Sequence, residues 1–362
     1  MSERKIAPSI KDIYEVNFIE TEIGVYNNPF CRMIDFGHIP PERIFATTSS
    51  TPVTEQDHPD LLVARDKIMT QKQEEINRRA AQNNTEPFKL WDGGLPRVEQ
   101  IIAIPDEMAL LVLGETTFFR HVAYTEKQIY PLDGPVEFPA NQKTIGNAWM
   151  ETTTPHNPNP LGAAMFIAIE KGETLMIGTP LVQTDERFQL KAVPSGYSHL
   201  RADKGKGRVQ ATVTALREMV EETGFQTWEI EDLNLVGRPF ERLLGKGAVT
   251  LVYTSLSELS RAEVLKRPRE QKDMPLFVPN RQDAFKEVMK FAPISQCYLP
   301  GGLLTIARYQ WGEKFAIELN QDLNSIGKDF LSLSEDEAEE VALEMASQLR
   351  PENIGKTVFE TQ

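Results

Sequence analysis

The chain has 362 residues, with 39 Lys and Arg against 53 Asp and Glu, which gives a formal net charge of −14. At roughly 150 residues per domain, this length predicts two or three domains. The 40% of hydrophobic and 25% of charged residues are ordinary for a globular protein and exclude a wholly disordered chain. The acidic balance argues against a surface built for general nucleic-acid binding.

The cysteine content and the distribution of apolar residues indicate the cellular compartment of the protein. The only two cysteines, Cys31 and Cys297, are far apart, which argues against a disulfide framework and a cysteine-based zinc site. No window approaches 18 uninterrupted apolar residues, so we expect no membrane span. The first 18 residues contain no apolar run typical of a signal peptide. We therefore expect a cytoplasmic protein.

The N-terminal part reads as mixed helix and strand. Short strand-like runs occur at residues 34–39 and 43–48, followed by a long amphipathic pattern that predicts a helix over residues 60–81. Residues 108–113 and 116–124 alternate like strands around Gly114-Glu115, which predicts a hairpin. The segment 152–160 then contains three prolines and two asparagines, and this composition predicts a domain boundary.

The central part predicts more strands. They cover residues 163–170, 174–180, 188–193, 233–238 and 248–257, with a helix over 208–222. Residues 261–285 are polar and contain proline, which indicates a long surface loop, with or without a short helix. A structural turn is expected at 299–303, followed by the start of a helix over 302–310. Near the C-terminus, Ser334 and Glu337 fit a capping box that opens an amphipathic helix.

These patterns divide the chain into three parts. Residues 1–157 form an α+β N-terminal domain of unknown role, residues 158–325 form the central domain, and residues 326–362 form an acidic C-terminal helix and tail.

The predicted helix over 208–222 carries an unusual group of charges. Glu218, Glu221 and Glu222 stand at positions i, i+3 and i+4, so their carboxylates share one helical face. Three carboxylates on one face repel each other unless cations neutralise them. Oxygen ligands of this kind suit a hard divalent cation such as Mg²⁺ or Mn²⁺. We therefore expect a metal site at these three residues.

A basic loop precedes this helix. Four cations, interrupted by Gly205 and Gly207, fall within eight residues: Arg201, Lys204, Lys206 and Arg208. Glycines let the backbone approach a ligand closely, and a helix N-terminus offers free amides to an anion. These four residues are therefore candidates for binding a substrate phosphate.

At this point the sequence resembles a known family. Residues 217–225 read Arg-Glu-Met-Val-Glu-Glu-Thr-Gly-Phe, which matches every specified position in the second half of the Nudix box. The first half departs from the family pattern, with Val209 where the family has Glu and Asp203 where it has Gly. Gln210 is the candidate substitute for the missing Glu. The resemblance covers residues 160–320.

The resemblance implies a fold and a reaction. The fold would be an α/β/α sandwich on a mixed sheet, and the pattern of residues 108–124 allows a degenerate copy of it in the N-terminal domain. The reaction would be Mg²⁺- or Mn²⁺-dependent hydrolysis of a nucleoside diphosphate linked to another moiety, such as ADP-ribose or a dinucleotide. The partner would be a small-molecule nucleotide, and a homodimer is compatible with the sequence.

The resemblance also assigns roles to residues. Glu218, Glu221 and Glu222 would bind the metal, and Arg217 would orient a catalytic glutamate, so that Arg217, Glu221 and Glu222 form the catalytic set. The general base would be a box glutamate or one from a later loop, for which the candidates are Glu258, Glu263, Glu270 and Glu287. A phosphate contact from His199 and a base-stacking role for Tyr197, Phe240 or Tyr253 stay open.

Two rival functions follow from the same residues. The altered positions Asp203 and Val209 favour a non-catalytic Nudix-like module that binds a nucleotide or a partner protein. The unassigned N-terminal domain allows an assembly protein that carries a Nudix fold. Retention of all three box carboxylates favours the enzyme.

Overall fold

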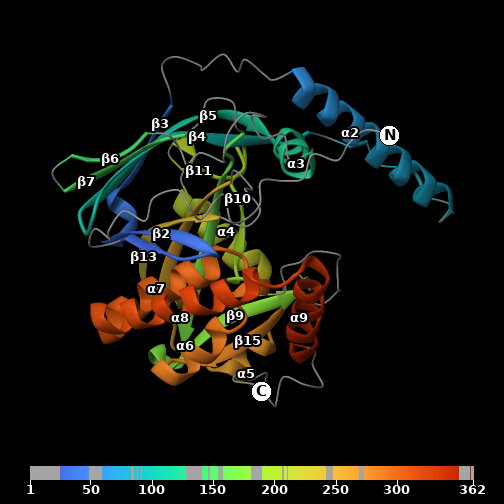
Figure 1. Ribbon diagram of the computed structural model, residues 1–362. Coiled ribbons are helices and arrows are strands. Elements are labelled where there is room, and N and C mark those ends of the chain that lie inside the picture. Colours follow the sequence, from blue (N-terminus) through green and yellow to red (C-terminus); the bar gives the residue numbers. More distant parts are fainter. Residues whose placement is uncertain are drawn as a thin grey trace.

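The computed structural model arranges the chain around two β-sheets (Figure 1). It describes residues 25–48, 59–82, 85–87, 89–90, 92–127, 141–145, 147–153, 158–180, 190–205, 208–209, 211–241, 248–268, 273–349 and 359.

The large sheet has eight strands and is mixed. The central pair β8 and β14 is parallel, and the other pairs are antiparallel. In spatial order the strands are β1 (Val25–Asn27), β2 (Cys31–Ile39), β13 (Glu231–Glu241), β14 (Val249–Leu256), β8 (Leu161–Ile169), β9 (Thr174–Pro180) and β15 (Asp273–Pro279), with β10 (Ser195–Tyr197) paired to β8. Every residue of β8 is buried, as expected for a strand covered on both faces.

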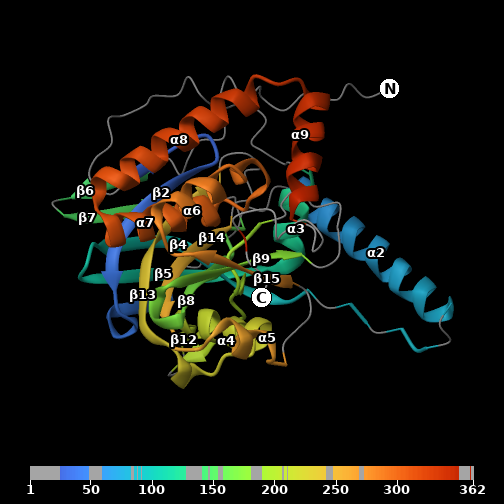
Figure 2. The same cartoon turned by 90° about the horizontal axis from the view of Figure 1, so that it is seen from below.

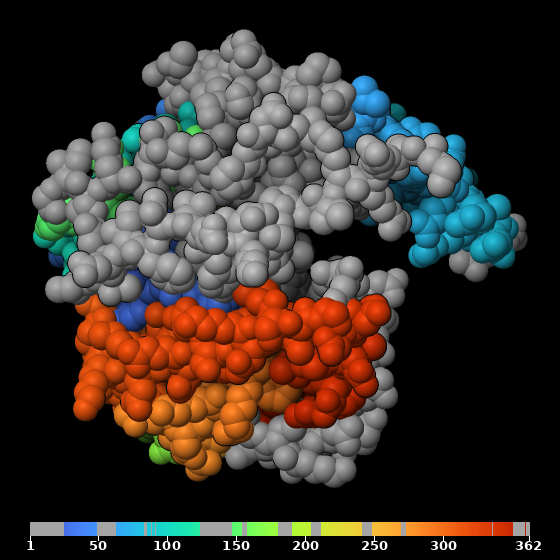
Figure 3. Space-filling view, in the orientation of Figure 1, coloured from blue at the N-terminus to red at the C-terminus, as the bar shows by residue number. Residues whose placement is uncertain are grey.

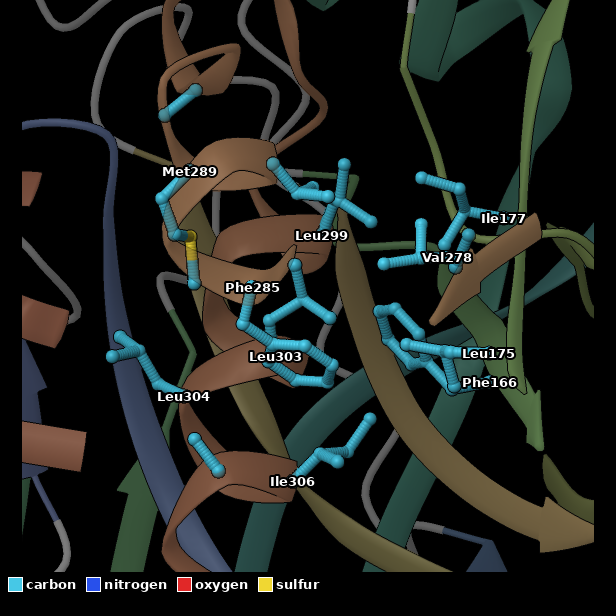
Figure 4. Close-up of a cluster of buried hydrophobic side chains, with 14 of the residues drawn as sticks. Phe166, Leu175, Ile177, Val278, Phe285, Met289, Leu299, Leu303, Leu304 and Ile306 are labelled. Carbon is cyan, nitrogen blue, oxygen red and sulfur yellow. The ribbon is translucent and has the colours of Figure 1, made fainter. Parts of the chain in front are cut away.

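Helices cover one face of this sheet. They are α6 (Gln282–Met289), α7 (Tyr298–Trp311), α8 (Glu313–Leu331) and α9 (Glu335–Gln348). Figure 4 shows Phe285 and Leu303 facing Phe166, Leu175 and Val278 of the strands, and these side chains belong to one buried cluster. In Figure 3, α8 and α9 form the outer layer on this side.

The opposite face carries α4 (Ala211–Thr223), the helix with the glutamates. Ala211, Ala215 and Met219 of α4 belong to a second buried cluster, together with Met165 and Ile167 of β8. The side chains of β8 therefore alternate, with Phe166 in the first cluster and its neighbours in the second. Helices thus lie on both faces of a mixed sheet, and the predicted α/β fold is confirmed.

The small sheet has five strands. Their order is β3 (Ile44–Thr48), β5 (Met108–Thr117), β4 (Gly94–Ile104), β7 (Ala148–Thr152) and β6 (Asn141–Ile145), with only β3 and β5 parallel. The helices α2 (Pro59–Gln82) and α3 (Phe118–Lys127) lie at one end, and α2 extends away from the rest of the molecule (Figures 1 and 2).

Short elements connect these layers. They are α5 (Arg261–Leu265), the two-residue strands β11 (Lys204–Gly205) and β12 (Arg208–Val209), and the 3₁₀ turns η1 (Pro41–Arg43), η2 (Glu170–Gly172), η3 (Thr227–Glu229) and η4 (Ala292–Ile294).

Several sequence predictions are confirmed. The helix expected over 60–81 is α2, and strands occur where the runs at 34–39, 43–48, 163–170, 174–180, 233–238 and 248–257 predicted them. The capping box of α9 is formed, since the Ser334 amide donates to the Glu337 carboxylate over 2.8 Å and the Glu337 amide donates to Ser334 Oγ over 3.4 Å. The helix predicted over 208–222 begins at Ala211, because Arg208 and Val209 form β12.

Three predictions are wrong. The expected hairpin at Gly114-Glu115 is one continuous strand, β5, and it is followed by the helix α3. The expected loop over 261–285 contains the strand β15 and the start of α6, in addition to the short helix α5 that the prediction allowed. The expected turn at 299–303 lies inside α7.

The expected division of the chain stays a prediction, and residues 154–157 at its boundary lie outside the described residues. The strands β1 and β2, which come before that boundary, pair with the large sheet through β13. Of the strand expected over 188–193, residues 190 and 191 form isolated bridges with 295 and 178. None of the described helices is long and apolar enough to cross a membrane.

Candidate functional site

Arg217, in the middle of α4, is the centre of a charged network. Its Nε donates to Oδ1 of Asp203 over 2.8 Å, and its Nη2 donates to Oδ2 of Asp203 over 3.2 Å and to the carbonyl oxygen of Tyr197 over 3.0 Å. Asp203 is fully buried and also accepts from the amide of His199 and from Thr214 Oγ1. A buried carboxylate needs this many donors to offset its lost hydration. The guanidinium is therefore held in one position.

Two of the three glutamates contact this arginine. Nη1 of Arg217 lies 2.8 Å from Oε1 of Glu218 and 2.8 Å from Oε2 of Glu221. Burial works against the charge of Arg217, but its hydrogen bond to Asp203 and the nearby carboxylates raise the pKa of Arg217 well above its usual range. Burial raises the pKa of Glu218, and the arginine opposes that rise.

Gly196 gives Glu218 its space. A Cβ added at Gly196 would lie 2.2 Å from Oε1 of Glu218. The strand β10 therefore lets the carboxylate lie directly against its backbone.

Glu222 has a different environment. Its Oε2 accepts a hydrogen bond from the amide of Ser195 over 2.9 Å. Burial raises the pKa of Glu222 to about 7, while Lys191 and the Ser195 amide oppose the rise. Lys191 also pairs with Asp273 at 2.7 Å, with both side chains largely buried. The pKa of Glu222 therefore lies near neutrality.

The three glutamates offer the right ligand atoms for a hard divalent cation, but their side chains are not arranged as a metal site. Glu218, Glu221 and Glu222 supply oxygen atoms from one helix, as Mg²⁺ prefers. In the described part of the chain, however, no three Asp, Glu, His or Cys side chains converge in a metal-binding arrangement. Arg217 holds two of the carboxylates, so a metal ion would have to compete with it.

The predicted phosphate-binding residues lie just before α4. Arg201 is exposed. The backbones of Lys204 and Arg208 lie in the paired strands β11 and β12, which return the chain to the start of the helix. Lys206 lies outside the described residues.

The candidate bases in later loops have local partners. Glu258 lies 3.5 Å from Lys171, Glu263 forms the capping box of α5 with Ser260, and Glu287 pairs with Lys290 at 2.7 Å. Glu270 lies outside the described residues.

The aromatic and histidine candidates separate by burial. Tyr253 and Phe240 are buried in the core, whereas Tyr197 is half-buried beside Arg217 and His199 is exposed.

Sequence reasoning missed the acid that holds Arg217. Asp203 lies fourteen positions before Arg217, where the family has glycine, and this departure was the available signal. Val209, at the position of the family glutamate, lies in β12, and Gln210 lies outside the described residues. Ser195, Lys191 and Asp273 were also missed, since nothing in their local sequence links them to Glu222.

No protein-family model matches this chain, and no curated protein does. The resemblance of residues 217–225 to the Nudix box is therefore a proposal supported by the motif and the geometry around it.

Proposed function

We propose that the protein is a Nudix-type, Mg²⁺- or Mn²⁺-dependent hydrolase acting on a nucleoside diphosphate linked to another moiety. One observation carries the proposal: Arg217 is fixed by the buried Asp203 and contacts Glu218 and Glu221. This is the role that the resemblance gives to the arginine, and here the buried Asp203 supports it.

The local charge supports binding of a divalent cation. One arginine faces Asp203, Glu218 and Glu221, so negative charge is in excess even when Glu222 is protonated. A partly buried excess of negative charge attracts a cation more strongly than the same charges in water. Glu218, Glu221 and Glu222 are the proposed ligands.

The chain's own residues have distinct parts in this mechanism. A bound metal would supply a Lewis acid for the diphosphate oxygens. A box glutamate, or one from a later loop, would accept the proton that the attacking water loses. Arg217 keeps the neighbouring carboxylates in place. Arg201, Lys204, Lys206 and Arg208 would hold the substrate phosphates, and ADP-ribose or a dinucleotide is the leading substrate.

A non-catalytic nucleotide-binding module is the second candidate, and a specific observation favours it. Glu218 and Glu221 are both engaged by Arg217, and no ready metal cluster occurs among the described side chains. In that case the three glutamates would be a structural network rather than a metal site.

A hydrolysis assay separates the two candidates. The protein would be incubated with a panel of nucleoside diphosphate sugars and dinucleotides, with Mg²⁺ or Mn²⁺ and with EDTA. The enzyme proposal predicts metal-dependent cleavage that Glu221→Gln and Glu222→Gln abolish. Glu318→Gln, at an exposed carboxylate of α8 beside Lys286, is the matched control and should retain activity.

Titration calorimetry covers the remaining outcomes. Nucleotide binding without cleavage, unaffected by EDTA, would establish the binding module instead. Absence of both cleavage and nucleotide binding would contradict both candidates.

A further inference from the structure

The segment from Ser195 to Asp203 lies between α4 and the five-stranded sheet, and on the α4 side it forms hydrogen bonds with side chains of that helix. The Ser195 amide donates a hydrogen bond to the Glu222 carboxylate, and the Tyr197 carbonyl oxygen accepts one from Arg217. Ser198 Oγ lies 2.6 Å from Thr214 Oγ1. The positions of Arg217 and Glu222 therefore depend on where this segment lies.

The other side of the same segment is held by the five-stranded sheet and its helix α3. Nε2 of His121 in α3 lies within hydrogen-bonding distance, 2.8 Å, of Oη of Tyr197. The two rings make an edge contact with centroids 5.2 Å apart, and the Leu200 amide donates to the Gly94 carbonyl over 3.3 Å.

Helix α3 is itself well fixed. Asp92, just before β4, accepts hydrogen bonds from the Phe119 amide over 2.8 Å and from Thr117 Oγ1 over 2.7 Å. His121 is buried. The helix therefore offers Tyr197 a rigid partner.

Tyr197 joins the two sides. Its hydroxyl contacts His121, and its carbonyl oxygen accepts from Arg217. A tyrosine side chain has only two main torsions, so fixing its hydroxyl restricts the backbone from which it projects. A displacement of about 1 Å at a catalytic group can lower a rate by about a hundredfold.

We propose that His121 and Tyr197 are positioning residues through which the five-stranded sheet sets the place of Arg217 and its glutamates. The N-terminal part of the chain is then a working component of the site. This inference rests on the proposed hydrolase function for its kinetic consequences, but its structural content is independent of that function.

The central variant is Tyr197→Phe, which keeps the ring and removes only the hydroxyl. We expect kcat to fall about tenfold with KM within about twofold, because the change misplaces a group that acts in the transition state. His121→Phe should behave alike, and the double variant should be no worse than either single one. His121→Gln, which keeps a polar nitrogen near the position of Nε2, should restore most of kcat. Tyr26→Phe, which removes a tyrosine hydroxyl bonded to Glu313, is the matched control and should leave kcat unchanged.

A second measurement does not use activity. In protein labelled with ¹⁵N-arginine, the Nε–H signal of Arg217, assigned through Arg217→Lys, reports its hydrogen bond to Asp203. Tyr197→Phe should shift or broaden that signal, and Tyr26→Phe should not.

The outcomes separate the two proposals. An unchanged Arg217 signal and an unchanged kcat in folded Tyr197→Phe would overturn the positioning role. A wild-type protein that cleaves no substrate would count against the proposed hydrolase, while the Arg217 signal would still decide the inference made here.

Discussion

Arg217 donates to both carboxylate oxygens of Asp203, from Nε over 2.8 Å and from Nη2 over 3.2 Å. The two residues are fourteen positions apart in the sequence, and the β11–β12 pair lies between them. This two-point contact ties the loop before α4 to the middle of the helix. Two-point contacts between guanidinium and carboxylate fix geometry as well as charge.

Asp203→Asn should therefore destabilise the fold. The amide keeps the shape but loses the charge, and it can accept from only one of the two guanidinium nitrogens. We expect a loss of about 2 kcal/mol in the free energy of unfolding, measured by urea denaturation. Asp283→Asn, at an exposed ion pair with Arg281, is the control and should have little effect. Equal stability of Asp203→Asn and the wild type would mean that Glu218 and Glu221 suffice to hold the arginine.

Gly196→Ala should disturb the site with little effect on the fold. The new methyl group would meet the carboxylate of Glu218 at 2.2 Å, and the flexible end of that side chain would move away. Binding of Mn²⁺, measured by calorimetry, should weaken about tenfold if Glu218 is a ligand. Gly114→Ala is a matched control, since its Cβ would meet the carboxylate of Glu99 at 2.3 Å, in β4 of the small sheet. Equal Mn²⁺ affinity in both variants and the wild type would remove Glu218 from the metal site.

Glu222→Gln should change how stability depends on pH. The pKa of Glu222 is about 7 in the folded protein against an ordinary value of 4.5, so the folded state holds this proton more tightly than the unfolded state. In the wild type, the contribution of protonated Glu222 to the free energy of unfolding is therefore lost as the pH rises from about 4.5 to about 7. Glutamine carries no charge at any pH. The stability of the variant relative to the wild type should increase by about 2–3 kcal/mol between pH 5 and pH 8. A difference independent of pH, in urea denaturation, would contradict this account.

The basic loop should act on substrate binding. If Lys204 and Lys206 hold a phosphate equally in the ground state and the transition state, replacing both by alanine raises KM and leaves kcat nearly unchanged. Charge-assisted contacts are each worth about 1.5–3 kcal/mol, so we expect at least a tenfold loss in kcat/KM. A fall in kcat at constant KM would instead place the contact in the transition state. Unchanged kinetics would leave the loop without a role in phosphate binding.

The fragment 158–362 should not fold alone. Without β2, the strand β13 becomes an open edge, and the core loses Met33, Phe36 and Ile39. We expect this fragment to be insoluble when expressed by itself and soluble when expressed together with residues 1–157. A soluble, folded 158–362 fragment would support the domain boundary that the proline-rich segment predicts.

The elements that the sequence predicted correctly are those with a strong local signal. The helix α9 has its capping box, and β8 and β9 are apolar runs around a tight turn. The wrong predictions concern residues whose usual preference is overridden by tertiary packing. Pro275 and Pro279 suggested a loop, but among the described strands β15 pairs only with β9, at the edge of the sheet, where proline is tolerated.

The expected turn at 299–303 failed for a similar reason. Pro300 lies in the first turn of α7, where its missing amide costs nothing. Gly301 and Gly302 sit where the helix approaches the sheet closely, since a Cβ at Gly302 would lie 2.2 Å from the ring of Phe166. No local pattern reveals such a neighbour.

In the candidate site, too, the sequence predicted the residues with a local pattern but not their partners. The i, i+3, i+4 spacing predicted that Glu218, Glu221 and Glu222 lie on one helix, and all three lie in α4. The partners of these residues could not be predicted, because Asp203, Ser195 and Tyr197 reach them through the fold rather than through sequence spacing.

The pairing of β2 with β13 has a consequence for synthesis of the chain. All five strands of the small sheet lie between residues 44 and 152, so that sheet can close while the ribosome is still making the rest. Apart from the three-residue strand β1, residues 31–39 have no partner among the described strands until residues 231–241 have been made. At about 5–20 residues per second, this interval lasts roughly 10–40 s. During that time the apolar segment containing Met33, Ile34 and Phe36 lacks its β13 partner and is exposed to association with other nascent chains.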